Sequence, residues 1–93
     1  MDEIVIVTRH EGLVKWLASR GIKGRVIVQV KPEDIVGKDV YGNLPLHLAA
    51  TTRTISTVDM NLPFDKRGQD LSEEEMDKYN PILHTYQVRE VNF

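Results

Sequence analysis

Apolar residues near the start of the chain change within a few positions from a continuous run to a helical spacing. Residues 4–7 are all apolar and β-favouring, which is typical of a strand covered on both faces. From Leu13 the apolar positions, Trp16 and Leu17 among them, follow the spacing of a helix, and Gly21 offers a C-terminal stop. The pattern therefore predicts a strand followed by a helix.

The middle of the chain predicts more strands, which are separated by a turn region and a short helix. These strands are expected over residues 25–30, 39–42 and 55–60. The turn region is expected over residues 32–38. Pro45 is expected at the first position of the helix, where its missing N–H costs nothing, and the helix is expected to end near residue 52.

A long polar loop over residues 61–70 leads to a well-marked helix start in the last third of the chain. Ser72 and Glu75 have the spacing of a capping box, in which each side chain binds a backbone N–H of the other residue. Leu71 and Met76 are placed to pack together as the hydrophobic staple of the same motif. A helix is therefore expected to begin at residue 72.

The order of these elements, with a final strand expected over residues 86–91, defines the predicted fold. Strand–helix–strand connections are right-handed and join parallel strands, so the chain is expected to form a single α/β domain over residues 1–93. Its sheet is expected to be mainly parallel, with about five strands and flanking helices.

Polar residues gather where two of the predicted parallel strands end. Residues 8–10 (Thr-Arg-His) follow the first strand, and residues 42–47 ("GNLPLH") follow the strand over 39–42. Ligands of such sheets bind beyond the carboxyl ends of the strands. We therefore expect both corners, and the loop that carries Lys66, Arg67 and Gly68, to meet in one positive pocket.

The first corner has two interpretations. A hydroxyl, a guanidinium and an imidazole beside a helix N-terminus, as in Thr8, Arg9 and His10, can form a cradle for an anion. Alternatively, Thr8 caps the helix while Arg9 and His10 are simply solvated. The residues by themselves favour neither interpretation.

The second corner is equally open. His47 is expected in the first helical turn after Pro45, where the helix dipole would keep the imidazole neutral and able to accept a proton. Alternatively, His47 packs between two leucines. Asn43 either caps this helix, which is the simpler interpretation, or binds the edge of a base. Gly42 either allows a close backbone approach or only ends the strand.

Composition and charge narrow the classes of partner. The 12 Lys and Arg residues against 14 Asp and Glu give a net charge of −2, with no basic stripe, so no DNA partner is expected. A small anionic ligand is still allowed, because a few arginines and helix N-termini can hold it locally. Arg67–Gly68 is either a phosphate clamp or a solvated turn. Without cysteine, and with no two of the 3 histidines spaced as ligands on one element, neither a metal site nor a cofactor is expected.

The expected cellular setting follows from what the sequence lacks. The absence of cysteine fits a reducing compartment. No secretory leader is recognisable, and the longest apolar stretch is too short to cross a bilayer. A cytoplasmic protein with no membrane partner is therefore expected.

Several segments also resemble a known family. "VTRHEGLVKWLASRGI", "GKDVYGNLPLHLAA", "LPFDKRGQDLSEEEM" and the terminal "YQV" resemble, in order and over nearly the whole chain, a small CRISPR-ancillary family found beside type III systems. The most specific pieces lie at residues 8–10, 44–50 and 67–72. At Asn43 the family more often has Thr or another small residue.

The resemblance implies a fold and an activity. The family is similar to CARF-type Rossmann-like proteins, which implies a Rossmann-like, CARF-related domain and a ring nuclease. Such an enzyme binds cyclic tetra-adenylate, the second messenger of type III effector complexes, and linearises it without metal. The ribose 2′-hydroxyl attacks its neighbouring phosphate and leaves a 2′,3′-cyclic phosphate end, which switches off signalling.

The resemblance also implies roles for individual residues. Arg9 would stabilise the charge of the phosphorane, and His10 or His47 would act as the base or as the acid for the leaving group. The remaining corner and loop residues would hold phosphates or adenines. These predicted ligand-binding residues are Thr8, Gly42, Asn43, Leu44, Pro45, Arg67 and Gly68.

A homodimer is expected, because the messenger is rotationally symmetric and two facing pockets would match it, and because a small domain gains buried surface by pairing. Two other functions remain open. A sensor or sink would hold the cyclic ligand uncut and would need the arginines but not the histidines. A structural protein of the defence locus would use the same edge to contact another protein.

Overall fold

A mixed, mostly parallel sheet forms the centre of the protein. The computed structural model describes residues 3–66 and 69–92. The sheet has five strands in the order β2-β1-β3-β4-β5, of which only β5 is antiparallel to its neighbour. The strands are β1 (Ile4–Val7), β2 (Arg25–Ile27), β3 (Asp39–Gly42), β4 (Thr54–Asp59) and β5 (Ile82–Tyr86).

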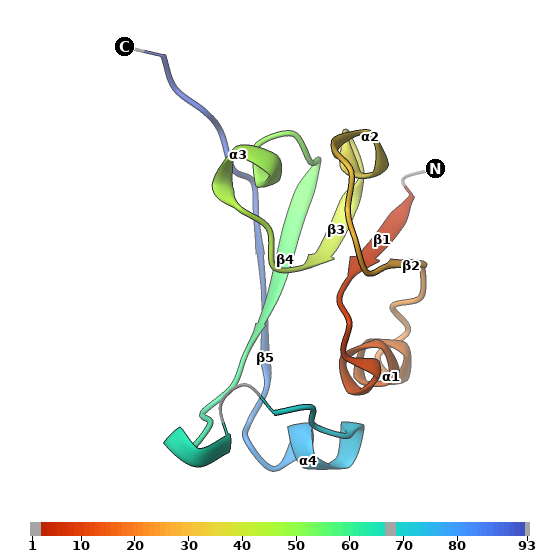
Figure 1. Ribbon diagram of the computed structural model, residues 1–93, viewed down its shortest axis with the longest axis vertical. Coiled ribbons are helices and arrows are strands. Elements are labelled where there is room, and N and C mark those ends of the chain that lie inside the picture. Colours follow the sequence, from red (N-terminus) through yellow and green to blue (C-terminus); the bar gives the residue numbers. More distant parts are fainter. Residues whose placement is uncertain (1–2, 67–68, 93) are drawn as a thin grey trace.

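Helices cover both faces of the sheet. Those on one face are α1 (Glu11–Ser19) and α4 (Glu73–Asp77), and those on the other are α2 (Pro32–Ile35) and α3 (Leu46–Ala49). A short 3-10 helix, η1 (Phe64–Lys66), lies in the loop after β4. Figure 1 shows α2 and α3 beside the starts of β3 and β4, whereas α1 and α4 lie toward the ends of the parallel strands.

The side chains of β1 divide the core into two layers, because successive residues of a strand point to opposite faces. Val5 packs with Val40 and Ile55 beneath α2 and α3. Ile6 packs with Trp16 of α1 on the other face. Each of these side chains is at most 4% exposed, and burial of one such side chain contributes roughly 1.5–3 kcal/mol. This packing fixes the backbone of the central strands.

Two predicted helix boundaries are confirmed. Gly21 has φ +80° after α1, and the N–H of Ile22 donates to the carbonyl of Leu17 at 2.9 Å, which closes the helix as a Schellman motif. At α4, the Ser72 hydroxyl accepts from the N–H of Glu75 at 3.2 Å. The Ser72 N–H donates in return to the Glu75 carboxylate at 3.2 Å and lowers its pKa.

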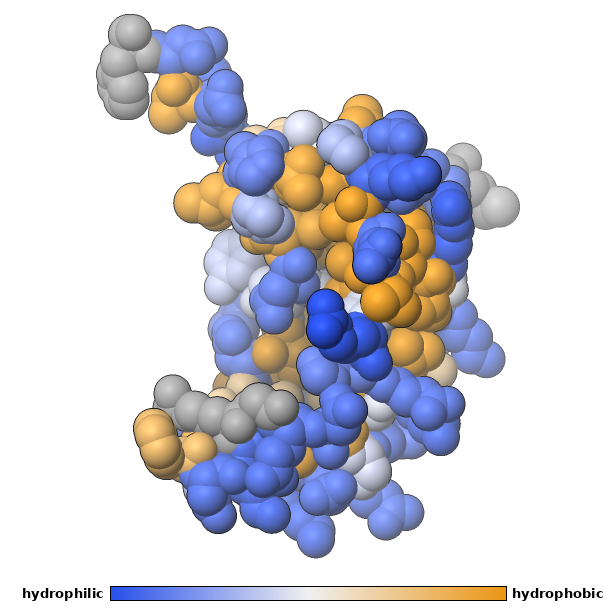
Figure 2. Space-filling view, viewed as in Figure 1, coloured by the Kyte–Doolittle hydropathy of each residue, from blue (hydrophilic) through white to orange (hydrophobic). Residues whose placement is uncertain are grey.

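Three predicted strands have different bounds in the structure, and the one expected over residues 55–60 is shifted by one residue, to Thr54–Asp59. The strand expected over residues 25–30 ends at Ile27, because its neighbour β1 ends at Val7, opposite Ile27. Val28 lies beyond it and is 58% exposed. Figure 2 shows hydrophobic residues gathered on the surface near β2. The final strand is Ile82–Tyr86 and not 86–91, because only these residues pair with β4. The alternation of polar and apolar residues over 86–91 resembled a strand, but it could not show which segment pairs with β4.

The short helices also differ from the prediction. The region expected as a turn contains α2, whose first residue is Pro32 and whose N-terminus is stabilised by Asp34, since its carboxylate accepts from the N–H of Lys31 at 3.0 Å. Pro45 precedes α3 and does not begin it, because its ψ of 149° is extended. The helix expected to run to residue 52 ends at Ala49.

Candidate functional site at the carboxyl edge

The ends of β1 and β3 lie next to each other, which confirms that the first corner and the start of the second meet. In the strand order β2-β1-β3, the chain leaves β1 toward one side and β3 toward the other. Ligands of open α/β sheets bind in the crevice at this reversal. Gly42 pairs with Val7 and has φ +135°, and a Cβ there would lie 2.1 Å from the Val7 carbonyl oxygen. Glycine is therefore required where the two strands end.

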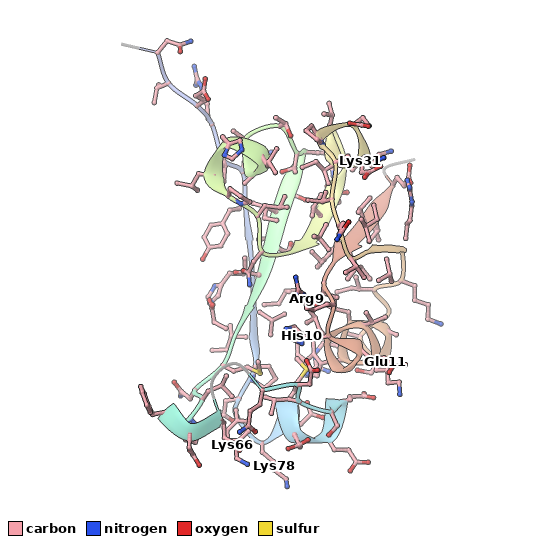
Figure 3. All side chains as sticks on the ribbon, viewed as in Figure 1. Arg9, His10, Glu11, Lys31, Lys66 and Lys78 are labelled. Carbon is pink, nitrogen blue, oxygen red and sulfur yellow. The ribbon has the colours of Figure 1, made fainter. Side chains whose placement is uncertain are left out.

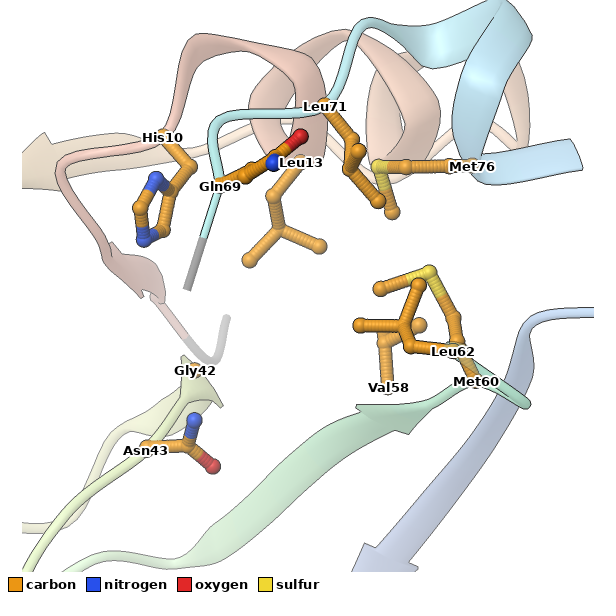
Figure 4. Close-up of a pocket in the computed structure, with 10 residues that line it drawn as sticks. All are labelled: His10, Leu13, Gly42, Asn43, Val58, Met60, Leu62, Gln69, Leu71 and Met76. Carbon is orange, nitrogen blue, oxygen red and sulfur yellow. The ribbon is translucent and has the colours of Figure 1, made fainter. Parts of the chain in front are cut away.

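A cavity of about 220 Å³ opens at this edge (Figure 4). Its walls come from α1, β4, the loop after β4 and α4, and they are mainly apolar. The apolar wall residues are Leu13, Val58, Met60, Leu62, Leu71 and Met76. Three polar side chains, those of His10, Asn43 and Gln69, join them. The cavity thus combines an apolar interior with polar groups from three segments.

His10 is held by a carboxylate from a distant part of the chain. Its Nδ1 contacts Oδ1 of Asp70, which lies 60 residues further along. Because Nδ1 donates to a carboxylate in this arrangement, the other ring nitrogen, Nε2, is the one left to accept or transfer a proton. The imidazole lies at the cavity (Figure 4), so Nε2 is available to a ligand there.

Thr8 shapes the turn between β1 and α1. Its Oγ1 accepts from the backbone N–H of His10 at 3.0 Å. The residue before α1 is His10, whose carbonyl accepts from the N–H groups of Leu13 and Val14 at 3.2 and 3.4 Å. Thr8 therefore does not cap the helix, which was one of its two interpretations. Its hydroxyl instead fixes the backbone that presents His10.

Arg9 lies beside His10 but lines a different hollow. This second hollow, of about 260 Å³, is also lined by His10, by Val26 of β2 and by Val28 just beyond it. Figure 3 shows Arg9 and His10 next to each other after β1. Within residues 3–66 and 69–92, the guanidinium of Arg9 has no ion pair or hydrogen bond. Arg9 is thus exposed and close to the cavity without lining it.

The second corner is divided between two cavities. Asn43 lines the His10 cavity and also a cavity of about 340 Å³ on the opposite face, where Leu44 lies. Pro45 is exposed and lines neither. The predicted pair Arg67 and Gly68 lies outside the described residues.

His47 does not lie at the cavity that His10 lines, contrary to the expectation that both share one pocket. It is exposed on α3 and does not line the His10 cavity. The chain after Asn43 runs back along the sheet. The backbone carbonyl of Thr51, just beyond α3, accepts a hydrogen bond from the N–H of Gly37, which precedes β3. This helix therefore lies toward the amino ends of the strands (Figure 1). With only 4 residues, it is also too short for the dipole effect that was expected at His47.

The described residues offer no obvious metal site. No group of three or more His, Cys, Asp or Glu side chains among them is placed to hold a metal ion. Within the same part of the chain, no helix has the length and apolar character needed to cross a membrane.

Asp70 and Gln69 are the site residues that the sequence did not identify. Both immediately precede Leu71, which is 7% exposed and packs with Met76 as the predicted staple. Since α4 packs against α1, this staple brings the preceding residues back to His10. The capping box was the available signal, because a helix start that docks on the core also positions the residues before it.

The fold and the cavity define a small α/β protein with a candidate site at the reversal of its strand order. The model of a family described as "Putative CRISPR-associated protein (Cas_VVA1548)" matches residues 5–89. The chain belongs to this CRISPR-associated family. None of the curated proteins and none of the solved structures compared with the chain gives a significant match.

Proposed function

We propose that this protein is a ring nuclease of type III CRISPR defence, which binds cyclic tetra-adenylate and linearises it without a metal ion. The observation that carries the proposal is the His10–Asp70 pair at a cavity on the carboxyl edge of β1 and β3. Membership of a CRISPR-associated family supports the biological setting. Cleavage of the messenger would switch off the effectors that it activates.

The proposed reaction needs little chemistry from the protein. The 2′-oxygen of a ribose forms a bond to the neighbouring phosphorus while the bond from phosphorus to the 5′-oxygen breaks. The proton of the 2′-hydroxyl passes to a base, and an acid protonates the departing 5′-oxygen. The products are a 2′,3′-cyclic phosphate and a 5′-hydroxyl. Because the nucleophile belongs to the ligand, the protein has to align it and stabilise the charge on phosphorus.

His10 is proposed to perform a proton transfer in this reaction. Its Nδ1 contacts Asp70, so Nε2 is free for the 2′-hydroxyl or for the 5′-oxygen. Asp70 is proposed as a positioning residue, since it touches the imidazole and not the reacting atoms. A positioned side chain that transfers a proton typically contributes 10²–10⁴-fold to a rate, about 3–5 kcal/mol.

Arg9 is proposed to bind the phosphoryl oxygens next to His10. A guanidinium donates two parallel hydrogen bonds to a phosphate, and charge-assisted bonds of this kind are stronger than neutral ones. A ligand that extends from the cavity across His10 reaches the hollow beside Arg9. The strand order β2-β1-β3, with its reversal at this edge, supports the proposed Rossmann-like, CARF-related character of the domain.

A homodimer is part of the proposal. Pockets that enclose a ligand of drug size have roughly 300–1,000 Å³, whereas the cavity of one chain has about 220 Å³. A ring of four nucleotides is larger than such a ligand, so one chain can enclose only part of it. Two chains related by a two-fold axis would present two cavities to the symmetric ring. Cleavage on each side would then give linear di-adenylate.

A sink that holds the ligand uncut is the second candidate. The observation that favours it is that His10 is the single imidazole lining the cavity among the described residues, since His47 lies on α3. A reaction that needs both a base and an acid would then require a group from the ligand, from water or from the second chain.

The two candidates separate in one assay. The protein, in molar excess, is incubated with cyclic tetra-adenylate in EDTA, and the products are resolved by chromatography and mass spectrometry. We expect linear di-adenylate with a 2′,3′-cyclic phosphate. Intact ligand together with a raised melting temperature of the protein would favour the sink. Intact ligand without any thermal shift would reject both candidates in favour of a structural role.

A further inference from the structure

The interior of the His10 cavity suits a flat heterocycle better than a phosphate. The six apolar side chains that line it come from α1, β4, α4 and the loops around them. Burial of a charged phosphate against such walls is costly, because nothing there replaces its hydration. A ring face, by contrast, gains favourable contacts with thioether sulfurs, and Figure 4 shows the side chains of Met60 and Met76 on opposite sides of the space.

Two amides lie at the polar side of the cavity. Gln69 is held in place because its Nε2 donates to the carbonyl of Asp65 at 3.0 Å. This bond leaves the Oε1 acceptor and a second N–H donor of Gln69 for a ligand. Asn43 contributes another amide from the end of β3. Each amide thus offers a donor and an acceptor side by side.

This donor set distinguishes between bases. Adenine presents an amino donor next to a ring-nitrogen acceptor, and the side-chain amides of Asn and Gln bind this pair in bidentate fashion. Guanine presents two acceptors on the corresponding edge, which Arg and Lys bind. No Arg or Lys is among the lining residues in the described part of the chain. The cavity volume of about 220 Å³ is below the range of pockets for larger ligands, so one base is the expected occupant.

We infer that this cavity is an adenine-binding subsite, in which Gln69 and Asn43 read the edge of the base while the methionines contact its faces. The inference rests on the proposed function, since it assigns the place of one nucleotide of the cyclic ligand. The phosphodiester on the ribose of this nucleotide then lies outside the cavity at His10. The subsite thereby sets which bond is presented for cleavage and which base is accepted.

A mononucleotide titration tests the inference without any need for cleavage. Protein labelled with ¹³C at the methionine methyls is titrated with adenosine 5′-monophosphate, and the signals of Met60 and Met76 are followed by NMR. We expect ring-current shifts at both methyls. Ribose 5-phosphate, which lacks the base, should leave them unchanged. Equal shifts with ribose 5-phosphate, or no shifts with adenosine 5′-monophosphate, would overturn the inference.

Base selectivity and the role of Gln69 are tested in the same experiment. Uridine and guanosine 5′-monophosphates should bind on the order of tenfold more weakly than the adenosine nucleotide. Gln69→Ala should weaken adenosine 5′-monophosphate binding by a similar factor. Gln87→Ala is the matched control, because Gln87 lines the cavity on the opposite face. Equal affinities for the three nucleotides, or equal effects of the two substitutions, would overturn the adenine assignment.

The failure of this inference and the failure of the proposed function are distinguishable. If cyclic tetra-adenylate is cleaved but the mononucleotide does not shift Met60 and Met76, the subsite is wrong and the ring nuclease stands. If the mononucleotide binds as expected and the cyclic ligand stays intact, the adenine subsite is supported and the proposed ring nuclease activity is rejected.

Discussion

Two histidine–carboxylate pairs in this protein have similar chemistry and different surroundings. His10 contacts Asp70 at the carboxyl edge of the sheet. Nε2 of His84, on β5, lies 3.5 Å from Oδ2 of Asp59, on the antiparallel neighbour β4. The two imidazoles are almost equally exposed, at 47% and 45%. Neither exposure nor partner type therefore distinguishes them.

The pairs differ in what lies next to them. His10 lines a cavity and is followed by a helix, whereas His84 stacks on Tyr86 with ring centroids 6.2 Å apart and does not line that cavity. Asp59 and His84 are neighbours through strand pairing, since His84 is opposite Thr57. Asp70 reaches His10 only through the docking of α4. The comparison teaches that the place in the fold, and not the presence of the pair, makes a histidine a candidate for catalysis.

The largest expected effect comes from removing the imidazoles themselves. His10→Ala should slow cleavage of cyclic tetra-adenylate on the order of 10²-fold or more, because a proton transfer is lost. His84→Ala is the matched control and should leave the rate unchanged. Single-turnover cleavage measures both. Equal effects of the two substitutions would remove the distinction between the pairs.

Substitution of the two carboxylates should also affect cleavage only at the His10 pair, and by less than removal of the imidazole. Asp70→Asn should lower the cleavage rate by about tenfold, equivalent to about 1.4 kcal/mol, because the imidazole loses its fixed orientation. It should also change the ¹⁵N NMR signature of the His10 tautomer, which a merely structural role would not move. Asp59→Asn is expected to alter neither. An unchanged His10 tautomer in Asp70→Asn would contradict the positioning role.

The next smaller effect concerns the helix that brings Asp70 to His10. Ser72→Ala removes the cap of α4 and should lower the free energy of unfolding by about 1 kcal/mol, measured by chemical denaturation. Ser56→Ala is an unsuitable control because Ser56 is buried, so Ser19→Ala, at the end of α1, is preferred. Chemical shifts of His10 should respond to Ser72→Ala, and those of His84 should not.

The same cap should make this region sensitive to acid. The pKa of Glu75 is lowered by the hydrogen bond from the Ser72 N–H, so its stabilisation is complete above the ordinary value of 4.5 and is lost as pH falls through the lowered pKa. The His10 signals should therefore shift with the loosening of α4 as the pH falls through this lowered pKa. In Glu75→Gln this component should be absent at every pH. Acid sensitivity that persists in Glu75→Gln would assign it to another group.

The smallest expected effect is that of the third histidine. His47→Ala should change cleavage by less than about twofold, because His47 lies on α3 outside the cavity. The same single-turnover assay measures it. A loss as large as that of His10→Ala would show that His47 reaches the reaction, for which a second chain is the available route.

Some features of the fold could be predicted because they depend on neighbours in the chain. The continuous apolar run gave β1 with its observed bounds, and Gly21 gave the end of α1. The Ser72–Glu75 capping box gave the start of α4. The meeting of the Thr8–His10 corner with Gly42 followed from the rule that parallel strands end at one edge.

Other features could not be predicted because they depend on which segments pair in space. β2 is cut short by the end of its neighbour β1, and β5 is selected by its pairing with β4. The position of α3 depends on how the extended segment after Asn43 runs along the sheet. The position of α3 in turn sets how far His47 lies from the cavity.

By itself, the sequence determined the bounds of β1 and β3, the end of α1 at Gly21, the start of α4, and that His10 follows a buried strand. Only the tertiary structure decided that Asp70 meets His10, that the methionines and amides enclose one cavity, and that His47 lies elsewhere. The physical reason is that caps, turns and periodicity act over a few residues, whereas a site is assembled by packing. The staple of Leu71 and Met76 on the core brings together groups that are 60 residues apart.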